Sequence, residues 1–470
     1  MKDMKKSVLI LTVFLLLWGG WFACYPYFMK WLEGFSFFST VPDFFSVHFQ
    51  FPADIFRYVG AFLLQFFTYP AAGAAIQALL PILGVLSVWA TVKMIFKDPD
   101  SLFWIPFLIV PVIVNSQLDD LTLVKTLQIL VLLACIVLAV LLIRLFVKFS
   151  LDLPGFMRKT WLVIAISVLS AGLSLYVLQK GPLSSHHEAV ARLTYWGEHK
   201  QWDKILKEVS RQDALTNEYK RRYVLLALSE TDRLPDYAFR YGLSSSNDFH
   251  FQNPDGPLAL KLNILFYRAL GLHNPVIYYA YQQALTSGSG LSFDAMRTLA
   301  DAYLELKDYE LAKKYLDILD HSLCNRKWVQ DRIQKLETIK DSSPEYHMTG
   351  SRFVLIDFYK DISAMASRYP DNKKYADYLL CGLLADKSGN RFFSVFDMVA
   401  GTHYKDTRTM PLLYQEALCL IAGYEPEVLE KYPVDERIIA RFDDFSKLVR
   451  SGKVSQAKRK YADTYWAYVY

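Results

Sequence analysis

The sequence has few cysteines and lacks the short motifs by which common enzyme classes are found. Only five of its 470 residues are cysteine, and no two of them form a CxxC pair. The patterns HExxH, GxSxG, GxGxxG and GxxxxGKS/T are also absent. The sequence therefore gives no support for a zinc peptidase, a serine hydrolase, a dinucleotide enzyme or a P-loop nucleotidase. We predict no cofactor and no metal ion.

The cysteines are scattered along the chain. Cys24 and Cys135 lie in apolar stretches, whereas Cys324, Cys381 and Cys419 stand singly in the C-terminal part. An odd number of thiols cannot all pair within one chain, and single buried thiols pack as small hydrophobic side chains. We expect free thiols, with one disulfide among the three C-terminal cysteines as the open alternative if that part of the chain is extracytoplasmic.

Charge and hydropathy both change near residue 180. Up to Lys180 the chain has 13 Lys and Arg against 9 Asp and Glu, and the remainder has 39 against 38. A nearly neutral C-terminal part has no electrostatic support for binding a phosphate backbone, so we expect no nucleic-acid partner. Apolar residues make up 53% of the sequence, and their excess lies in the first 180 residues.

Apolar runs long enough to cross a bilayer recur up to Leu178 and are absent after it. A spanning helix needs about 20 predominantly apolar residues. The first run continues into aromatic residues instead of a polar mature start, which predicts an uncleaved span and no removed leader. Together the runs define a predicted transmembrane domain over residues 1–181, with five spans at 7–28, 71–96, 102–116, 121–147 and 161–179.

The segment 30–69 between the first two spans is crowded with aromatic residues but broken by prolines and by Asp43, Asp54 and Arg57. It is therefore unsuited to a single span. Aromatic rings concentrate at the headgroup level of a membrane, where one face is apolar and the other is hydrated. We predict that this segment lies in the membrane interface or re-enters it.

The number of crossings decides which side of the membrane the C-terminal part faces. The run 102–116 is short and contains two prolines. If it crosses, one side holds all three basic clusters, as the positive-inside bias requires: Lys2/Lys5/Lys6, Lys93/Lys97 and Arg144/Lys148/Arg158/Lys159. We therefore predict five spans, a cytoplasmic N-terminus and a C-terminal domain on the opposite side.

Residues 182–470 show amphipathic helical patterns separated by Gly, Pro, Asn and Asp, without the alternation typical of strands. The clearest helix pair spans 292–319, where Ala300 and Ala312 supply small side chains for a close antiparallel approach, as in a tetratricopeptide (TPR) unit. Looser repeats occur elsewhere. We predict an all-α fold in which transmembrane helices precede a soluble TPR-like α-solenoid. An irregular helical bundle is the alternative.

Several stretches together resemble a family of bacterial inner-membrane proteins, typical of Bacteroidetes, whose function is unknown. The resemblance is carried by Tyr58–Gln65 with Tyr69-Pro70 and Gly73, Gln201-Trp202-Asp203, Leu226-Ala227-Leu228, Tyr414–Leu418 and Thr464–Tyr468. It implies several spans followed by TPR-like helices and an inner-membrane location. With the C-terminal domain on the outer side, as the basic clusters predict, that domain is expected to be periplasmic. The resemblance implies no activity.

Carboxylates in the predicted outer loops form the one constellation with a candidate catalytic role. Asp43 and Asp54 lie in the first outer loop, and Asp119 and Asp120 lie in the second. The candidate catalytic residues among them are Asp43, Asp119 and Asp120. The arrangement is similar to that of multi-span transferases that use lipid-linked sugars, where an interfacial carboxylate deprotonates the acceptor. The alternative is that these residues are solvated loop positions.

Histidines and surplus aromatic residues have simpler interpretations. Adjacent His186 and His187 point about 100° apart on a helix and chelate one ion poorly. The isolated histidines are expected at the surface or as helix caps: His250, His273, His321, His347 and His403.

Most aromatic residues are expected to fill gaps between helices. Candidates for lining a groove are Tyr279, Tyr281, Tyr465, Trp466, Tyr468 and Tyr470.

These patterns favour a membrane protein without enzymatic activity. We expect the bilayer and a protein partner to be its binding partners, with the TPR-like domain mediating protein–protein interaction in envelope assembly or transport. A glycosyltransferase-like enzyme that uses a lipid-linked sugar is the alternative.

Overall fold

The computed structural model of the chain describes residues 3–147, 150–152, 159–180, 186–287, 290–340 and 358–470. Over these residues the fold is helical, and no β-strand forms. The chain divides into two compact units. Unit 1 comprises Met1–Arg192 and Ala280–His347, and unit 2 comprises Leu193–Tyr279 and Met348–Tyr470. The predicted domain boundary near residue 181 stays a prediction, but the structure adds that the described residues between 280 and 340 pack with the N-terminal part.

Five helices of unit 1 are long and apolar enough to cross a membrane. This agrees with the five predicted apolar helices and is compatible with a multi-pass membrane protein. The first helix ends at Cys24 and not at Phe28, because Pro26 lacks an N–H group and begins the next helix. The five candidate spans are α1 (Asp3–Cys24), α5 (Pro70–Ile95), the broken helix Pro99–Asp119, α7 (Val124–Phe146) and α8 (Thr160–Lys180).

Prolines explain why the third candidate span is broken. Pro99 and Pro106 lie at the starts of two short 3₁₀ helices, η2 (Pro99–Leu102) and η3 (Ile105–Leu108). A regular helix, α6 (Ile109–Asp119), follows. Since proline cannot donate a backbone hydrogen bond, the regular α-helical hydrogen-bond pattern begins only at Ile109.

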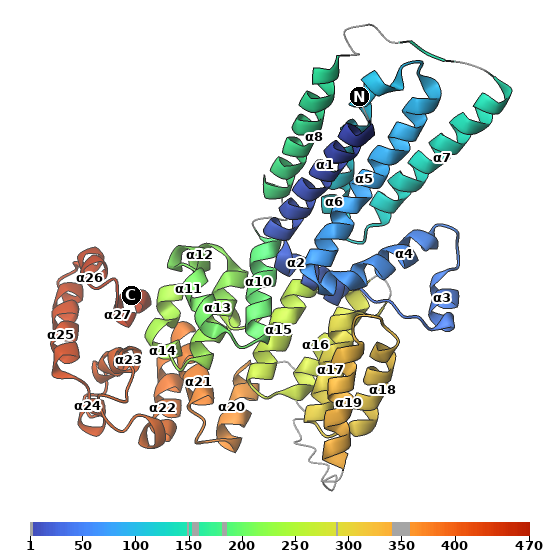
Figure 1. Cartoon of the computed structure of the whole chain (residues 1–470). Coiled ribbons are helices and arrows are strands. Elements are labelled where there is room, and N and C mark those ends of the chain that lie inside the picture. The colour runs from blue at the N-terminus through green and yellow to red at the C-terminus, as the bar shows by residue number, and fades with distance from the viewer. Residues whose placement is uncertain (1–2, 148–149, 153–158, 181–185, 288–289, 341–357) are drawn as a thin grey trace. The chain divides into compact units, whose positions relative to one another are not determined.

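The candidate spans pack around α5, which contacts α1, α6 and α7, while α8 contacts α1 and α6 (Figure 1). The helix α7 differs in burial from α5. Of α7 only Thr126 is buried, whereas much of α5 is enclosed by its neighbours. Exposed apolar side chains on a spanning helix are expected where it meets lipid.

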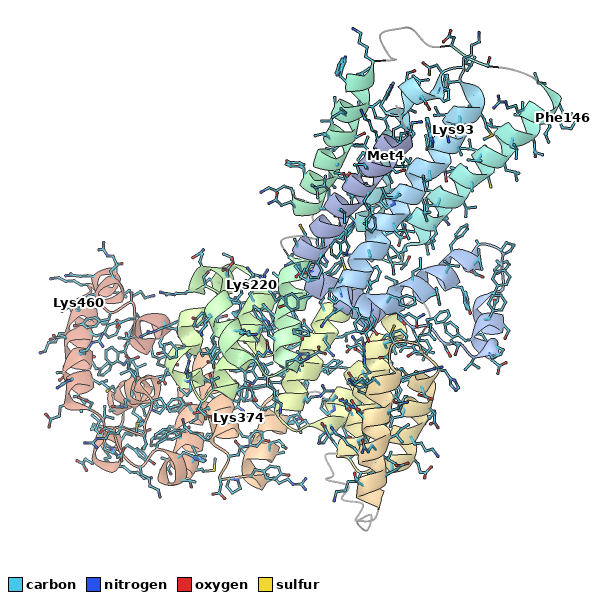
Figure 2. All side chains as sticks on the ribbon, in the orientation of Figure 1. Met4, Lys93, Phe146, Lys220, Lys374 and Lys460 are labelled. Atoms are coloured by element: carbon cyan, nitrogen blue, oxygen red, sulfur yellow. The ribbon has the colours of Figure 1, made fainter. Side chains whose placement is uncertain are left out.

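One end of the candidate spans is basic. Figure 2 shows Met4 near the start of α1, Lys93 near the end of α5 and Phe146 at the end of α7, all at this end. Lys6 ties the start of α1 to the α5–α6 connection, since its ammonium lies 2.5 Å from the Asp100 carboxylate. The same ammonium lies 5.1 Å from the centre of the Trp89 ring, which stabilises the cation further.

At the opposite end, short helices connect α1 to α5. They are α2 (Pro26–Phe35), α3 (Pro42–His48), α4 (Asp54–Leu64) and the 3₁₀ helix η1 (Gln65–Thr68). The predicted interfacial segment 30–69 has two different surroundings. Phe37 and Phe38 are buried, whereas Phe45 and Phe51 are exposed. Its position at a membrane interface stays a prediction.

A helical hairpin completes unit 1. It consists of α17 (Phe293–Glu305) and α18 (Tyr309–Asp320). The next helix, α19 (Arg326–Lys340), is counted with them, and the three helices are called the hairpin α17–α19 below. Ala300 and Ala312 are fully buried where α17 and α18 pack together. The helix pair predicted over 292–319 is therefore present, with small residues at its contact as expected.

Unit 2 is built from short helices joined by tight turns (Figure 1). Its centre is formed by α13 and α21, which are buried along most of their length and contact each other. The helices with their bounds are α11 (Trp202–Glu208), α12 (Arg211–Thr216), α13 (Glu218–Glu230), α14 (Leu234–Tyr237), η5 (Ala238–Tyr241), η6 (Ser246–Asp248), α15 (Pro257–Ala269), α20 (Phe358–Arg368), α21 (Lys373–Ala385), α22 (Gly389–His403), α23 (Leu412–Ala422), α24 (Val428–Lys431), α25 (Glu436–Arg450), α26 (Val454–Lys460) and α27 (Tyr465–Val469).

Two further helices, α10 (His187–Glu198) and α16 (His273–Thr286), each have residues in both units.

Candidate functional site

The candidate site is the junction at which the hairpin α17–α19 meets the short helices at the end of the candidate spans. At its centre is the ion pair between Glu33 of α2 and Arg297 of α17, with an N–O distance of 2.8 Å. Glu33 is only 3% exposed. Arg297 also donates a hydrogen bond to Asn325 at 3.1 Å. A charge buried this deeply is tolerated only when it is paired, so the ion pair specifies where the hairpin attaches.

Backbone and ring contacts extend the junction along the start of α17. The Phe293 N–H donates to the Ser36 carbonyl at 2.8 Å, and the Phe37 and Phe293 rings lie 5.1 Å apart. Gly34 faces Asp294 so closely that a Cβ atom at Gly34 would lie 3.2 Å from the Asp294 Cβ. The chain after α2 therefore lies directly against the first turn of α17.

Two polar residues hold the connection between α18 and α19. Both the backbone N–H and the hydroxyl of Thr40 donate to the His321 carbonyl at 2.9 Å. Gln65, which is fully buried, accepts a hydrogen bond from the Leu323 N–H at 3.2 Å. Thr40 and Gln65 lie before α3 and after α4, so both ends of the α3–α4 segment are bound to the hairpin.

A buried carboxylate at the start of α10 fixes the first turn of α2. Glu188 accepts hydrogen bonds from the N–H groups of Phe28 at 2.8 Å and Tyr27 at 3.4 Å. Loss of solvent raises the pKa of Glu188 to about 7, although these two hydrogen bonds favour the charged form. Nearby, the Tyr25 hydroxyl donates to the Leu178 carbonyl at 2.6 Å, which joins α2 to the end of α8.

The three candidate catalytic carboxylates occupy separate local settings. Asp43 is exposed in the first turn of α3. Asp119 pairs with Lys125 at 2.7 Å. Asp120 accepts hydrogen bonds from Thr122 and from the Lys125 N–H, so it stabilises the turn that begins α7. Among the described residues, no hydrogen bond or ion pair joins Asp43 to either of the other two. Their catalytic role stays a prediction.

Polar side chains also lie buried between the candidate spans next to this turn. The Gln117 amide donates to the Gln77 carbonyl at 2.8 Å, and the hydroxyls of Ser116 and Thr126 lie 2.8 Å apart. All four side chains are buried. Interhelical hydrogen bonds of this kind contribute roughly 0.6–2 kcal/mol each in a bilayer, and here they hold α5, α6 and α7 together.

Unit 2 contains a buried carboxylate of its own. Asp377 accepts hydrogen bonds from the Tyr404 and Tyr414 hydroxyls at 2.6 and 2.8 Å, and Lys373 lies 3.5 Å away. Burial raises the pKa of Asp377, and the two tyrosines oppose that shift. Because all three ring and carboxylate groups lie in the core, this network stabilises the packing of α21 against α22 and α23.

An open pocket of about 550 Å³ lies on unit 2 beside the start of α21. Its cationic residues are Arg368, Lys373 and Lys374. Lys374 is paired with Glu230 at 2.5 Å, and Asp232 and Asp371 also line the pocket. The mixed charges give it no preference for ligands of one sign.

One histidine differs from its prediction. His250 is 6% exposed and stacks on the Phe266 ring at 5.4 Å, so the prediction that it lies at the surface or caps a helix is wrong. Burial, and to a smaller extent the positive charge of Arg222, lowers the pKa of His250 to about 4. His347 lies outside the described residues. No group of three or more His, Cys, Asp or Glu side chains in the described part of the chain is placed to hold a metal ion.

The aromatic candidates and the cysteines are also placed. Tyr279, Tyr465 and Trp466 are buried, whereas Tyr281 and Tyr470 are half exposed. Tyr468 is intermediate, and its hydroxyl donates to two backbone carbonyls. All five cysteines are free.

A family model described as "Family of unknown function (DUF6057)" matches residues 2–178 and 121–470. The chain belongs to this family. No curated protein and no solved structure is significantly similar to it. Membership confirms the prediction of an uncharacterised family and brings no activity with it.

The Glu33–Arg297 ion pair at the junction of this DUF6057 chain is not predictable from sequence patterns alone. One signal was available, since Glu33 is the only acidic residue in the apolar and aromatic stretch from Trp31 to Phe38. An isolated carboxylate in such a stretch requires a partner when it is buried. No sequence pattern identifies Arg297 as that partner, because Arg297 lies 264 positions further along the chain.

Proposed function

We propose that this protein is an integral membrane protein that presents a TPR-like helical domain to a protein partner, in envelope assembly or transport. The observation that carries the proposal is the buried Glu33–Arg297 pair, which attaches the hairpin α17–α19 directly to the end of the candidate spans. A hairpin held in this way is a fixed platform, and a preorganised surface loses less entropy when a partner binds.

The packing of consecutive helices supports a TPR-like surface. The helices α17 and α18 form an antiparallel pair, and α20, α21 and α22 contact one another in chain order. Such units bury their apolar faces by stacking and leave the remaining faces for binding. We propose a protein as the partner that binds the platform. Among the described residues there is no cluster that could hold a metal ion, and the pocket beside α21 carries mixed charge.

The charge at the two ends of the candidate spans supports an orientation. Figure 2 shows Met4, Lys93 and Phe146 at the end opposite the hairpin. Lys6 follows Met4 by two residues in α1, and Arg144 lies in the last turn of α7 before Phe146. With the basic end in the cytoplasm, the hairpin faces the other side. We propose the inner membrane as the location and the periplasm as the side of the helical domain.

The test is crosslinking in intact cells with the full-length tagged chain, followed by mass spectrometry. We expect one protein partner to crosslink to residues of α18 or unit 2, and to be lost when two exposed residues of α18 are changed (Lys313→Glu/Lys314→Glu). The Asp119→Ala/Asp120→Ala variant should retain the partner, and so should Asp43→Ala, which tests the remaining candidate carboxylate.

The opposite pattern contradicts the proposal. If the chain captures only lipid-linked sugar or its processing enzymes, and the two aspartate substitutions abolish that capture while the α18 changes do not, the acidic loops act as an active site.

A further inference from the structure

The α3–α4 segment forms an arm with an apolar face that no described residue of unit 1 covers. Five large apolar side chains between residues 45 and 55 are exposed: Phe45 41%, Val47 61%, Phe49 37%, Phe51 68% and Ile55 36%. They follow one another closely along the chain. Scattered apolar residues are normal on a protein surface, but a contiguous group of this kind indicates a binding surface.

The other face of the arm is packed in protein. Phe38, which is 4% exposed, is surrounded by three aromatic rings of the arm: Phe44 at 5.9 Å, Tyr58 at 5.1 Å and Phe62 at 5.3 Å. The arm is therefore a built element with a fixed root. Its apolar tip is the part that requires a partner.

The root of the arm lies at the end of the candidate spans. After α4, the short helix η1 leads directly into α5 at Pro70. Gly60 of α4 also lies against the α6–α7 turn, where an added Cβ would come 2.4 Å from the Thr122 carbonyl oxygen. An element attached at this level is at the depth of the lipid headgroups if the five helices span a bilayer.

We propose that the tip of the arm, residues 45–55, inserts into the leaflet on the hairpin side of the membrane, with lipid acyl chains and glycerol groups as its partner. Aromatic side chains partition to that depth. The charged groups whose side chains are described on the arm are Asp43, Asp54 and Arg57, and Asp54 lies 3.9 Å from Arg57. Insertion therefore depends on apolar contact and not on attraction to anionic headgroups.

The consequence for the platform follows from the two ends of the arm. Thr40, just before α3, and Gln65, just after α4, bind the α18–α19 connection through His321 and Leu323. An inserted arm thus sets the height of the hairpin above the membrane. This inference concerns lipid, so it can fail while the docking function holds, and the reverse is also true.

The test places the photoreactive residue p-benzoylphenylalanine in the full-length chain in native membranes, in place of Phe51. Phe146, 88% exposed at the end of α7, is the lipid-facing control, and Tyr424, 88% exposed in unit 2, is the control for an exposed aromatic position outside the arm. We expect lipid adducts from positions 51 and 146 and none from position 424. The adducts from position 51 should be equally abundant at low and high salt.

Two outcomes overturn the proposal. One is that position 51 gives protein adducts, to a second copy or to another protein, and no lipid adduct while position 146 does. The other is that the probe in place of Phe49 keeps its full lipid yield in a Val47→Ser/Phe51→Ser background. We expect that yield to fall several-fold while the melting temperature in detergent stays unchanged, because Val47 and Phe51 are the most exposed of the five residues.

Discussion

Two buried glutamates of this chain bind backbone N–H groups in the first turn of a short helix. Glu188 binds the start of α2, and Glu416 accepts a hydrogen bond from the Tyr465 N–H at 2.7 Å at the start of α27. Glu416 is 3% exposed, and the adjacent Trp466 is fully buried. A carboxylate at a helix N-terminus is favourable, yet loss of solvent raises the pKa of Glu416 to about 7.

The raised pKa of Glu416 predicts a pH dependence with a defined sign. Its ordinary value is 4.5, so between about pH 4.5 and pH 7 the folded state binds more protons than the unfolded state. Stability is therefore greatest below that window and falls as the pH rises through it. The loss is of the order of 3 kcal/mol. Opening of α27, measured by hydrogen exchange at residues 465–467 and corrected for the intrinsic rate, should increase from about pH 5 to about pH 8.

The matched variants for that prediction are Glu416→Gln and Glu430→Gln. Glutamine keeps an acceptor for the Tyr465 N–H and cannot ionise, so Glu416→Gln should remove the pH dependence. Glu430 is exposed in α24, and its substitution should leave the dependence intact. Equal pH profiles for wild type and Glu416→Gln would show that another group controls α27.

The Glu33–Arg297 pair makes a second prediction at the residue scale. Arg297→Gln leaves the buried Glu33 carboxylate without its cation, which typically costs about 3–5 kcal/mol. We expect a lower melting temperature in detergent and faster proteolysis of the hairpin. The double variant Glu33→Gln/Arg297→Gln should recover part of the loss.

An exposed ion pair supplies the control for this cycle. Lys447 and Asp444 lie 3.9 Å apart with side chains 78% and 58% exposed, and such pairs contribute about 0–1 kcal/mol. If Arg297→Gln destabilises the protein no more than Lys447→Gln does, the buried pair does not hold the hairpin.

At the scale of elements, close packing of α4 on the α6–α7 turn is the feature most sensitive to side-chain size. A Cβ atom at Gly60 meets a backbone oxygen of Thr122, whereas nothing lies within 4 Å of one at Gly172 on α8. Because a backbone atom cannot rotate away, Gly60→Ala must displace α4. We expect a cost of about 1–3 kcal/mol, and an unchanged or slightly higher melting temperature for Gly172→Ala, since alanine favours helix. Equal melting temperatures for the two variants would contradict the packing.

A helix or segment could be predicted from the sequence when the residues that specify it lie close together in the chain. The pair α17–α18 was predicted because its apolar period, its turn and its small residues Ala300 and Ala312 all lie within one short stretch. The segment 30–69 was predicted only as a unit. Its division into a buried part around Phe38 and an exposed tip around Phe51 depends on how the rings of α3 and α4 pack on Phe38, and amino-acid composition does not reveal that packing.

For the whole molecule, the proposed topology of five spans puts the two ends of the chain on opposite sides of the membrane. Fusions of alkaline phosphatase should therefore be inactive after Phe96 and Phe146, and active after Asp120 and Lys180, because each crossing reverses the side. The decisive fusion is the one after Asp120, which reports on the proline-broken segment Pro99–Asp119. Green fluorescent protein at the same four positions is the control and should give the inverse pattern. An inactive phosphatase after Asp120 would reduce the spans to four.

The sequence by itself determined the five apolar helices, the all-helical character and the hairpin, because hydropathy, helix length and turn residues act over short stretches. Tertiary structure alone decided which polar groups are buried and with what partner. Glu33 and Arg297 meet across 264 positions, and His250 is buried against Phe266 instead of lying at the surface. Such pairings arise from long-range packing, where the cost of burying a polar group is met by a partner that no local pattern identifies.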